Sequence, residues 1–290
     1  MTESTTSPKG RLLAAGIVIV GFAVLYWQVL TKLVMDWYND DNYSHGFLIV
    51  PIAAYFAWER RDRLKAAARN PSILGLFVVI ASIGVLLAGI LGSELFLTRI
   101  SIVGVLVGAV LFMFGWRHLR ILTFPLAFLL LMIPIPAILF NQIAFPLQLL
   151  ASRFGETVMS AADVPVLREG NVLILANTTL EVAEACSGIR SLVSLLTLAI
   201  VLGYFSDRRM WVRVAVALSS IPVAVVTNGL RVAGTGIAAH RFGPAAAEGF
   251  IHEFSGWLVF VAAFALTIVI QRLISVVSPE PRPAPIPSSV

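Results

Sequence analysis

The chain has 290 residues, of which 58% are hydrophobic and 13% are charged, and its mean hydropathy is +0.90. No water-soluble domain of this length has such a composition, so it excludes a soluble enzyme and predicts a polytopic membrane protein. The net charge of +5 would suggest nucleic acid in a soluble chain, but in a membrane protein it marks cytoplasmic loops, and we expect no nucleic-acid partner. One cysteine and four scattered histidines give no pattern for a disulfide, a metal ion or another cofactor.

Apolar runs predict an all-α fold with about eight membrane-spanning helices. Residues 1–10 are polar and expected to be disordered, and the first apolar run is too long for the core of a cleaved signal peptide. Pro125, Pro134 and Pro136 should kink the fifth span or end it early. The predicted spans are 11–34, 47–58, 72–91, 98–116, 121–140, 189–205, 211–232 and 254–274.

The segment between the fifth and sixth spans, residues 141–185, has no spanning pattern. Its first part, residues 142–162, is amphipathic, which predicts a small helix along the extracytoplasmic membrane surface. After Pro165, β-branched residues alternate around turn residues, and we predict a small β-hairpin over residues 166–182, just before the helix that carries the cysteine.

With eight spans, both termini lie on the same side of the membrane. Most Lys and Arg residues fall at the N-terminus, in the loops after the second, fourth and sixth spans, and in the proline-rich tail, residues 276–290, which we expect to be disordered. The positive-inside rule makes this side cytoplasmic. We therefore predict one transmembrane domain, residues 11–275, with both termini in the cytoplasm.

The only cysteine, Cys186, lies where the polar segment changes into the sixth span. A thiolate in the first turn of a helix is favoured by unpaired backbone N–H groups and by the helix dipole, and Arg190, one turn later, adds a positive charge. This is an environment for a nucleophile. The plain alternative is that a lone cysteine in an apolar protein is a small buried hydrophobic residue.

The predicted topology brings two further residues to the side where Cys186 lies. Arg231 follows the cytoplasmic start of the seventh span by about 20 residues, or roughly 30 Å, which is one hydrocarbon thickness. His252 precedes the eighth span, which also begins outside. Asn228 shares a helical face with Arg231. Glu184, which lies on the same predicted side of the membrane, could orient His252 or Arg231 or be a solvated loop charge. A snorkelling arginine and an ordinary loop histidine are the alternatives.

Four ordered motifs resemble those of a known family, the exosortases, which are related to the archaeosortases. Together with the eight-span layout, the resemblance covers residues 12–275. The first motif contains Tyr43, Ser44 and His45, and the chemistry of these side chains assigns them no role in a reaction. The motifs are residues 41–46 (DNYSHG), 185–190 (ACSGIR), 228–232 (NGLRV) and 252–257 (HEFSGW).

The resemblance implies a membrane-embedded cysteine protease or transpeptidase in the inner membrane, with its active site on the extracytoplasmic face. Its substrates would be secreted proteins with a C-terminal sorting signal: a Pro-Glu-Pro type motif, a transmembrane helix and a basic cluster. By motif, Cys186 would be the nucleophile, His252 the proton-transfer partner and Arg231 the third catalytic residue. The implied partners are these proteins, membrane lipids and an extracellular polysaccharide or lipid acceptor.

Two other functions stay open. A transporter or flippase for an exopolysaccharide or lipid-linked intermediate would suit helices kinked by residues such as Pro222, but it predicts polar residues near the membrane midplane and two related halves. A non-catalytic assembly subunit for exopolysaccharide export would hold Cys186 buried and replaceable.

Overall fold

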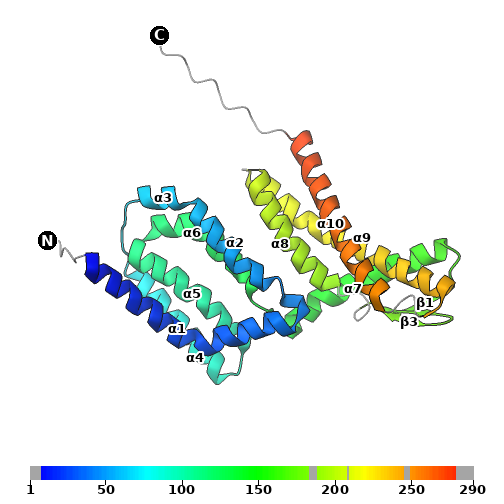
Figure 1. The fold of residues 1–290 in the computed structure, drawn as a ribbon, viewed down its shortest axis with the longest axis horizontal. Helices are drawn as coiled ribbons and strands as arrows, with labels where there is room; N and C mark the ends of the chain where they lie inside the picture. The colour runs from blue at the N-terminus through cyan, green and yellow to red at the C-terminus, as the bar shows by residue number, and fades with distance from the viewer. Residues whose placement is uncertain (1–7, 183–187, 208, 245–248, 279–290) are drawn as a thin grey trace, which may run out of the picture. The chain divides into compact units, whose positions relative to one another are not determined.

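The computed structural model describes residues 8–182, 188–207, 209–244 and 249–278. Backbone contacts divide the chain into two compact units, Met1–Pro136 and Ala137–Val290 (Figure 1). The first unit contains α1 (Pro8–Asn39), η1 (Asp41–Tyr43), α2 (Gly46–Glu59), α3 (Arg61–Ala66), α4 (Leu74–Leu91), α5 (Leu95–Phe114), α6 (Trp116–Phe128) and η2 (Leu129–Met132). The second contains α7 (Ala137–Ala161), β1 (Val166–Glu169), β2 (Val172–Leu175), β3 (Thr179–Glu181), α8 (Gly188–Ser206), α9 (Met210–Phe242) and α10 (Gly249–Val277).

A close antiparallel pair of helices, α4 and α5, lies within the first unit. A Cβ added to Gly75 would meet the backbone of Phe112, and one added to Gly89 would lie 2.8 Å from the backbone nitrogen of Thr98. The two backbones therefore approach more closely than larger residues would permit. Small residues at helix contacts are common in membrane proteins, where packing rather than hydrophobic burial holds helices together.

Four helices among the described residues are long and apolar enough to cross a membrane. A fifth span results if Trp116–Met132 and Ala137–Ala161 are taken together as one broken span. The prediction of about eight spans is therefore not confirmed. α2 has 14 residues, fewer than the about 20 that a spanning helix needs, and the apolar helix over Arg190–Ser206 is also short. The four are Leu74–Leu91, Leu95–Phe114, Met210–Phe242 and Phe254–Val277.

The fifth predicted span, residues 121–140, is interrupted in the way its prolines indicate. α6 ends at Phe128, the 3₁₀ turn η2 follows to Met132, and α7 begins only at Ala137. Pro134 and Pro136 have no backbone N–H and cannot continue the helical ladder, so the backbone is extended or irregular between η2 and α7.

Three short antiparallel strands follow α7 in the order β1-β2-β3. Val166 lies opposite Leu175 and Ile174 opposite Thr179. The segment thus forms a three-stranded sheet, one strand more than the hairpin that the sequence predicts. The amphipathic stretch before it, residues 142–162, falls largely within α7.

α9 continues well beyond residue 232, where the sequence predicts the seventh span to end. It has 33 residues, or about 50 Å at 1.5 Å per residue, which exceeds one hydrocarbon thickness. The additional turns pack on α7 and the sheet, where Val232 and Ala233 share a buried core with Met159 and Leu173. Arg231 therefore lies inside a continuous helix and not at a helix end.

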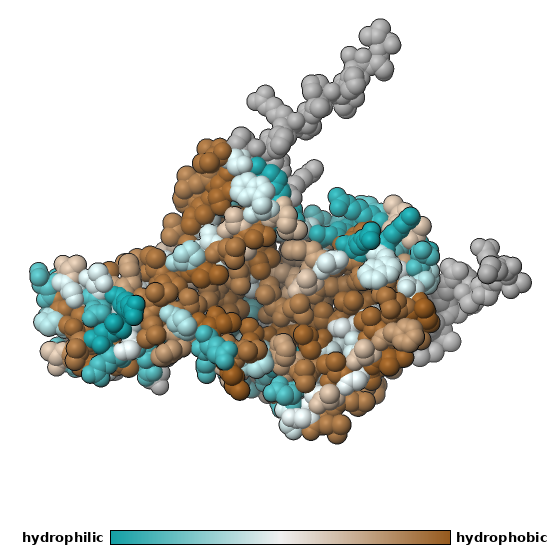
Figure 2. All heavy atoms as spheres, turned by 180° about the vertical axis from the view of Figure 1, so that it is seen from behind, coloured by the Kyte–Doolittle hydropathy of each residue, from teal (hydrophilic) through white to brown (hydrophobic). Residues whose placement is uncertain are grey.

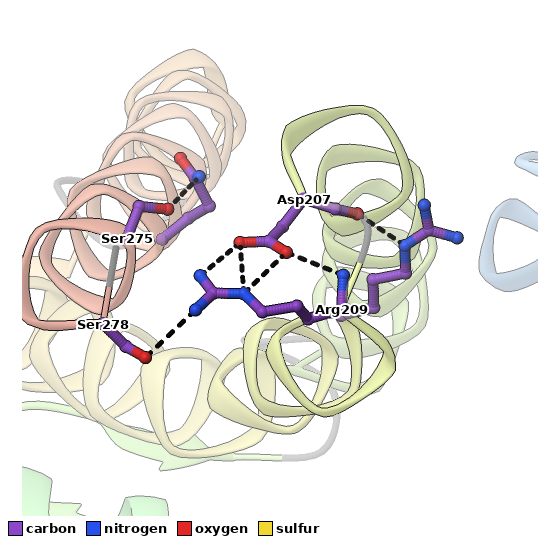
Figure 3. Close-up of polar contacts among 6 residues, drawn as sticks. Asp207, Arg209, Ser275 and Ser278 are labelled. Carbon is purple, nitrogen blue, oxygen red and sulfur yellow. Dashed lines mark hydrogen bonds and ion pairs between the residues drawn. The ribbon is translucent and has the colours of Figure 1, made fainter. Parts of the chain in front are cut away.

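A charged cluster connects Asp207, next to the end of α8, with the start of α9 and the end of α10 (Figure 3). Arg209 donates from Nη2 to the Asp207 carboxylate at 2.6 Å and from Nη1 to Ser278 Oγ at 3.1 Å. Arg213 Nε donates to the backbone carbonyl oxygen of Asp207 at 2.7 Å. The hydrogen bonds from Arg209 lower the pKa of the buried Asp207 carboxyl. The three helices are thus tied together at this end by charge.

Large hydrophobic side chains cover much of the visible face (Figure 2). Trp27 is 70% exposed and Leu91 is 86% exposed. Soluble monomers rarely expose so much contiguous apolar surface, whereas lipid-facing surfaces are made of it. Together with the candidate spans, this surface identifies a multi-pass membrane protein.

Candidate active site

The three predicted catalytic residues fall within the sequence range of the second unit, residues 137–290. Cys186 and Glu184 lie outside the described residues, and α8 begins two positions after the cysteine, at Gly188. Arg231 lies in α9. His252 lies near the start of α10, which begins at Gly249. The roles of Cys186 and His252 therefore stay predictions, while the surroundings of Arg231 are described.

The Arg231 guanidinium lies directly against α10. A Cβ added to Gly256 would be 2.8 Å from Nη2, 3.0 Å from Cζ and 3.2 Å from Nη1 of this arginine. Gly256 follows His252 by four residues, so the two positions share one face of α10, one turn apart. The missing side chain at position 256 lets Arg231 reach α10 close to the predicted histidine.

A pocket between α8, α9 and α10 contains this guanidinium. It encloses about 280 Å³ of empty space, part of it open to the surroundings. Its wall is mixed, with hydroxyl, amide and guanidinium groups on one set of residues and small or apolar side chains on the other. The lining residues are Ser191, Leu195, Ala224, Thr227, Asn228, Arg231, Gly256, Val259, Phe260 and Ala263.

Asn228 lines this pocket and is only 8% exposed. The neighbouring Thr227 also lines it, and its hydroxyl donates to the Val223 carbonyl oxygen at 2.7 Å. Asn228 and Arg231 line the same pocket, and their joint role in one active site stays a prediction.

Arg190 lies in the first described turns of α8 and is half-buried. It follows Cys186 by four positions, which keeps it one helical turn from the predicted nucleophile if the helix is extended back to that residue. Its predicted influence on the thiolate stays a prediction, because residues 183–187 lie outside the described ranges.

Tyr43, Ser44 and His45 belong to the first unit, where two of them contact the proline-interrupted segment. His45 Nε2 lies 3.2 Å from the Leu131 carbonyl oxygen, and the Tyr43 hydroxyl donates to the Ile135 carbonyl oxygen at 3.4 Å. The Ser44 hydroxyl donates to a carbonyl oxygen of its own turn at 3.0 Å. The motif therefore binds backbone oxygens that the interrupted helix leaves without their usual partners.

Trp37 completes this set of contacts. Its Nε1 donates to the Met132 carbonyl oxygen at 2.9 Å. In a continuous helix this oxygen would accept from the backbone nitrogen of residue 136, which is a proline and has no N–H. Gly46 makes room for the indole, because any side chain there would collide with it. We call the contacts of Trp37, Tyr43 and His45 with residues 131–135 the carbonyl clasp.

A family model described as transmembrane exosortase matches residues 37–269, which is well over half of the chain. The chain belongs to the transmembrane exosortase family. No curated protein and no solved structure matches it. The match includes the carbonyl clasp and the pocket around Arg231, so both are features of the exosortase region of this chain.

Burial lowers the pKa of His45 in this exosortase, against the opposite effect of the backbone carbonyls of Leu131 and Asn42. The neutral ring then carries its hydrogen on Nε2, where it donates to the Leu131 oxygen. The ring centroid of Tyr43 lies 6.5 Å from that of His45, and burial is the main cause that raises the pKa of Tyr43, which stays uncharged. The carbonyl clasp is therefore made by neutral groups.

Gly256 and Ser191 line the exosortase pocket. Gly256 belongs to the fourth motif, residues 252–257, but sequence reasoning gave it no role, and it did not single out Ser191. A signal for Gly256 was present, since it stands four residues after His252 in an apolar helix, where glycine lowers helix stability and needs a packing reason. Ser191 carried no comparable signal. Among the described residues, no three His, Cys, Asp or Glu side chains are grouped so as to hold a metal ion.

Proposed function

We propose that this exosortase cleaves the C-terminal sorting signals of secreted proteins and transfers the cleaved proteins to a cell-surface acceptor. The signal is a Pro-Glu-Pro type motif, a transmembrane helix and a basic cluster. The observation that carries the proposal is the position of Arg231. It lines a pocket between α8, α9 and α10, the three helices that contain or directly follow the last three motifs. Its guanidinium lies against Gly256, one turn from His252, in a pocket that is also lined by the helix following Cys186.

The reaction proceeds through a thioacyl intermediate. The Cys186 thiolate attacks the scissile carbonyl, and the tetrahedral oxyanion collapses with loss of the amine end of the C-terminal fragment. His252 protonates this leaving amine and later takes the proton of the acceptor nucleophile. Arg231 keeps its proton, because the pKa of arginine exceeds about 12, and it stabilises the oxyanion by charge and hydrogen bonding.

The site lies at the extracytoplasmic face of the inner membrane, with both termini in the cytoplasm. α9 begins at Met210, beside the basic residues Arg209 and Arg213, which the positive-inside rule assigns to the cytoplasm. About 20 residues of helix, roughly 30 Å, cross the hydrocarbon core and bring the chain close to Arg231 at the opposite interface. The last turns of α9 and the sheet that packs on them then lie outside the membrane.

The test is co-expression of the full-length protein with a secreted reporter that ends in the three-part signal. Intact mass spectrometry of the reporter should show cleavage just outside the transmembrane helix with the wild-type protein. In Cys186→Ala, processing should fall by roughly three orders of magnitude or more, because no other group supplies the nucleophile. An added mass on the new C-terminus would identify the acceptor.

The matched control is the same variant measured for expression and thermal unfolding, which should equal the wild type because the change removes a single sulfur atom. Continued release of the C-terminal fragment by a folded Cys186→Ala protein would contradict the cysteine mechanism. Absence of cleavage by the wild type across several sorting motifs would contradict the proposed function as a whole.

A further inference from the structure

β3 forms one edge of the three-stranded sheet, and some of its backbone groups face away from the sheet. The Val182 N–H donates to the Asn171 carbonyl oxygen, just before β2, at 3.0 Å. In an antiparallel pair, alternate residues bond to the partner strand, so Leu180 bonds to β2 as well. Thr179 and Glu181 therefore direct their N–H and C=O groups to the open side of β3.

The open side of β3 is accessible. Thr179 and Glu181 are exposed, whereas Leu180 between them is buried. Among the described residues, no backbone group outside the sheet bonds to Thr179 or Glu181. The opposite edge, β1, lies beside α7, where Arg168 Nε donates to the Glu156 carboxylate at 2.7 Å. Open strand edges pair with extended peptides in several classes of peptide-binding domain.

This edge lies close to Arg231 along α9. Leu180 packs near Gly236, since a Cβ added to this glycine would lie 3.4 Å from Leu180 Cδ1. Gly236 follows Arg231 by five residues, which is about 7.5 Å along the helix axis. Glu181 precedes Cys186 by five residues, a stretch that spans at most about 18 Å. A peptide paired with β3 is therefore held within reach of the proposed reaction centre.

We propose that the Pro-Glu-Pro segment of the sorting signal adds to this edge as a further strand of the sheet. Proline has no N–H, and the residue before a proline favours an extended backbone. The two prolines are separated by one residue, so both can face away from β3, where a missing N–H breaks no ladder bond. The glutamate between them then turns its N–H and C=O to β3. The inference rests on the proposed function and names how the signal is bound.

The two faces of the sheet determine the direction of the added strand. Residues directly opposite each other in a ladder place their side chains on the same face. In antiparallel pairing, the glutamate of the signal exchanges hydrogen bonds with Thr179 and shares its exposed face. In parallel pairing it would lie opposite Leu180 and share its buried face, which is unfavourable for a carboxylate. Pairing with Thr179 also avoids placing two carboxylates opposite each other at Glu181.

A second copy of this chain is the other possible occupant of the edge. β3 has only three residues, so pairing two such edges buries far less than the about 1,200 Å² of a stable protein interface. The sorting signal needs less contact, because its transmembrane helix already holds it in the same membrane at a high effective concentration. The short edge therefore favours the signal.

The test is disulfide cross-linking in membranes with the full-length Cys186→Ala protein, which contains no other cysteine. Glu181→Cys is added, and the co-expressed reporter has one cysteine, either two or three residues before the glutamate of its motif. Antiparallel pairing places the first position directly opposite residue 181, at a separation that a disulfide permits, and turns the second to the other face. The first position should cross-link at least about 5-fold better.

Leu167→Cys in the same background is the matched control, because Leu167 is 59% exposed on β1, at the other edge of the sheet. It should give no cross-link above background. Equal cross-linking from the two reporter positions, or from Leu167→Cys and Glu181→Cys, would overturn the inference. Cross-linking only between two copies of the chain would overturn it in favour of a dimer.

The wild-type protein with the same reporters separates the inference from the proposed function. Cleavage by the wild type without any cross-link at position 181 would overturn the inference and leave the proposed function standing. Absence of cleavage would count against the proposed function and, with it, the inference.

A backbone change tests the same edge through turnover. Thr179→Pro removes the N–H that the signal binds, and proline is tolerated at the first residue of an edge strand. Reporter processing should fall by about 10-fold or more, with a Tm near that of the wild type. Val166→Pro is the control, because Val166 begins β1 and its N–H faces away from β2. Equal loss of processing in both variants would contradict a specific role of the β3 edge.

Discussion

Arg231 depends on a residue with no side chain. Its guanidinium occupies the space that a side chain at Gly256 would fill, and this glycine lies on the face of α10 that also carries position 252. An oxyanion-stabilising group must be held close to its working position, because a displacement of about 1 Å can cost about 100-fold in rate. Gly256 is thus a positioning residue for Arg231 in the proposed reaction.

Gly256→Ala should reduce the rate of signal processing by about 10- to 100-fold. The added methyl group would lie within 3.2 Å of three guanidinium atoms, and the guanidinium must therefore shift. Because the displaced atoms are the far end of a flexible side chain, the fold should tolerate the change, and the Tm should stay equal or rise with the better helix propensity of alanine. Processing kinetics and thermal unfolding measure the two effects separately.

Gly234→Ala is the matched control. Gly234 also lies inside a helix, α9, but nothing lies within 4 Å of the position that its Cβ would take. The same gain in helix propensity, up to about 1 kcal/mol, is expected there without loss of processing. Equal activity of both glycine variants would show that the Arg231 guanidinium does not need the space at position 256.

At the scale of single residues, motif spacing predicted that Arg231 and Asn228 share a site, because both lie on one face of one helix. It could not predict that Asn228 lines two pockets. Those pockets are made by α7, α8 and α10 together with α9, and which side chains line a space between four helices depends on how the helices cross. A single sequence does not contain that information in readable form.

Among the elements, the sequence predicted the interruption between α6 and α7 correctly but placed the end of α9 too early. Pro134 and Pro136 predicted the interruption, because the missing N–H groups act locally. The continuation of α9 beyond residue 232 was missed, because its small residues give a weak hydrophobic signal. The continuation is stabilised by burial against Met159 and Leu173, which are distant in the chain.

The carbonyl clasp predicts a pH dependence of stability in the first unit. His45 has an ordinary pKa of about 6.5 when unfolded and a lower pKa in the folded protein because it is buried. Above about pH 6.5 both states are neutral and the contribution is complete. As the pH falls below this value the unfolded chain takes up a proton that the folded chain does not, and stability is lost toward the folded pKa.

His45→Gln should therefore show a smaller fall in Tm between about pH 7.5 and pH 5.5 than the wild type. Glutamine keeps an N–H donor for the Leu131 carbonyl oxygen but does not titrate. The control is His240→Gln, at an exposed position near the end of α9, which should keep the wild-type difference. An unchanged pH dependence in His45→Gln would mean that the buried imidazole does not contribute to acid sensitivity.

For the whole molecule, composition predicted the membrane class and the family resemblance predicted the exosortase assignment, which the match over residues 37–269 confirms. The number of spans was predicted less well. Apolar runs as short as residues 47–58 were counted as spans, although α2 has only 14 residues. Hydropathy measures how apolar a helix is, but its length and partners decide whether it crosses the membrane.

The orientation of the whole chain is testable with its single cysteine. A membrane-impermeant maleimide has only Cys186 to react with in the wild type, and labelling of intact cells is expected because the proposed site opens outside. A reference cysteine is provided by Asp62→Cys in a Cys186→Ala background. Asp62 lies in the basic helix α3, and its side chain is 79% exposed, so it should react only after the membrane is permeabilised, as the positive-inside rule requires.

The two cysteines must give opposite results for the proposed orientation to hold. Labelling of residue 62 in intact cells would place the basic face outside and would move the proposed active site to the cytoplasm, where secreted substrates no longer reach it. Failure of Cys186 to react even after mild detergent treatment would instead count against an accessible nucleophile. Because a reactive thiolate needs both access and a lowered pKa, the rate of labelling as a function of pH then measures whether the start of α8 favours the thiolate.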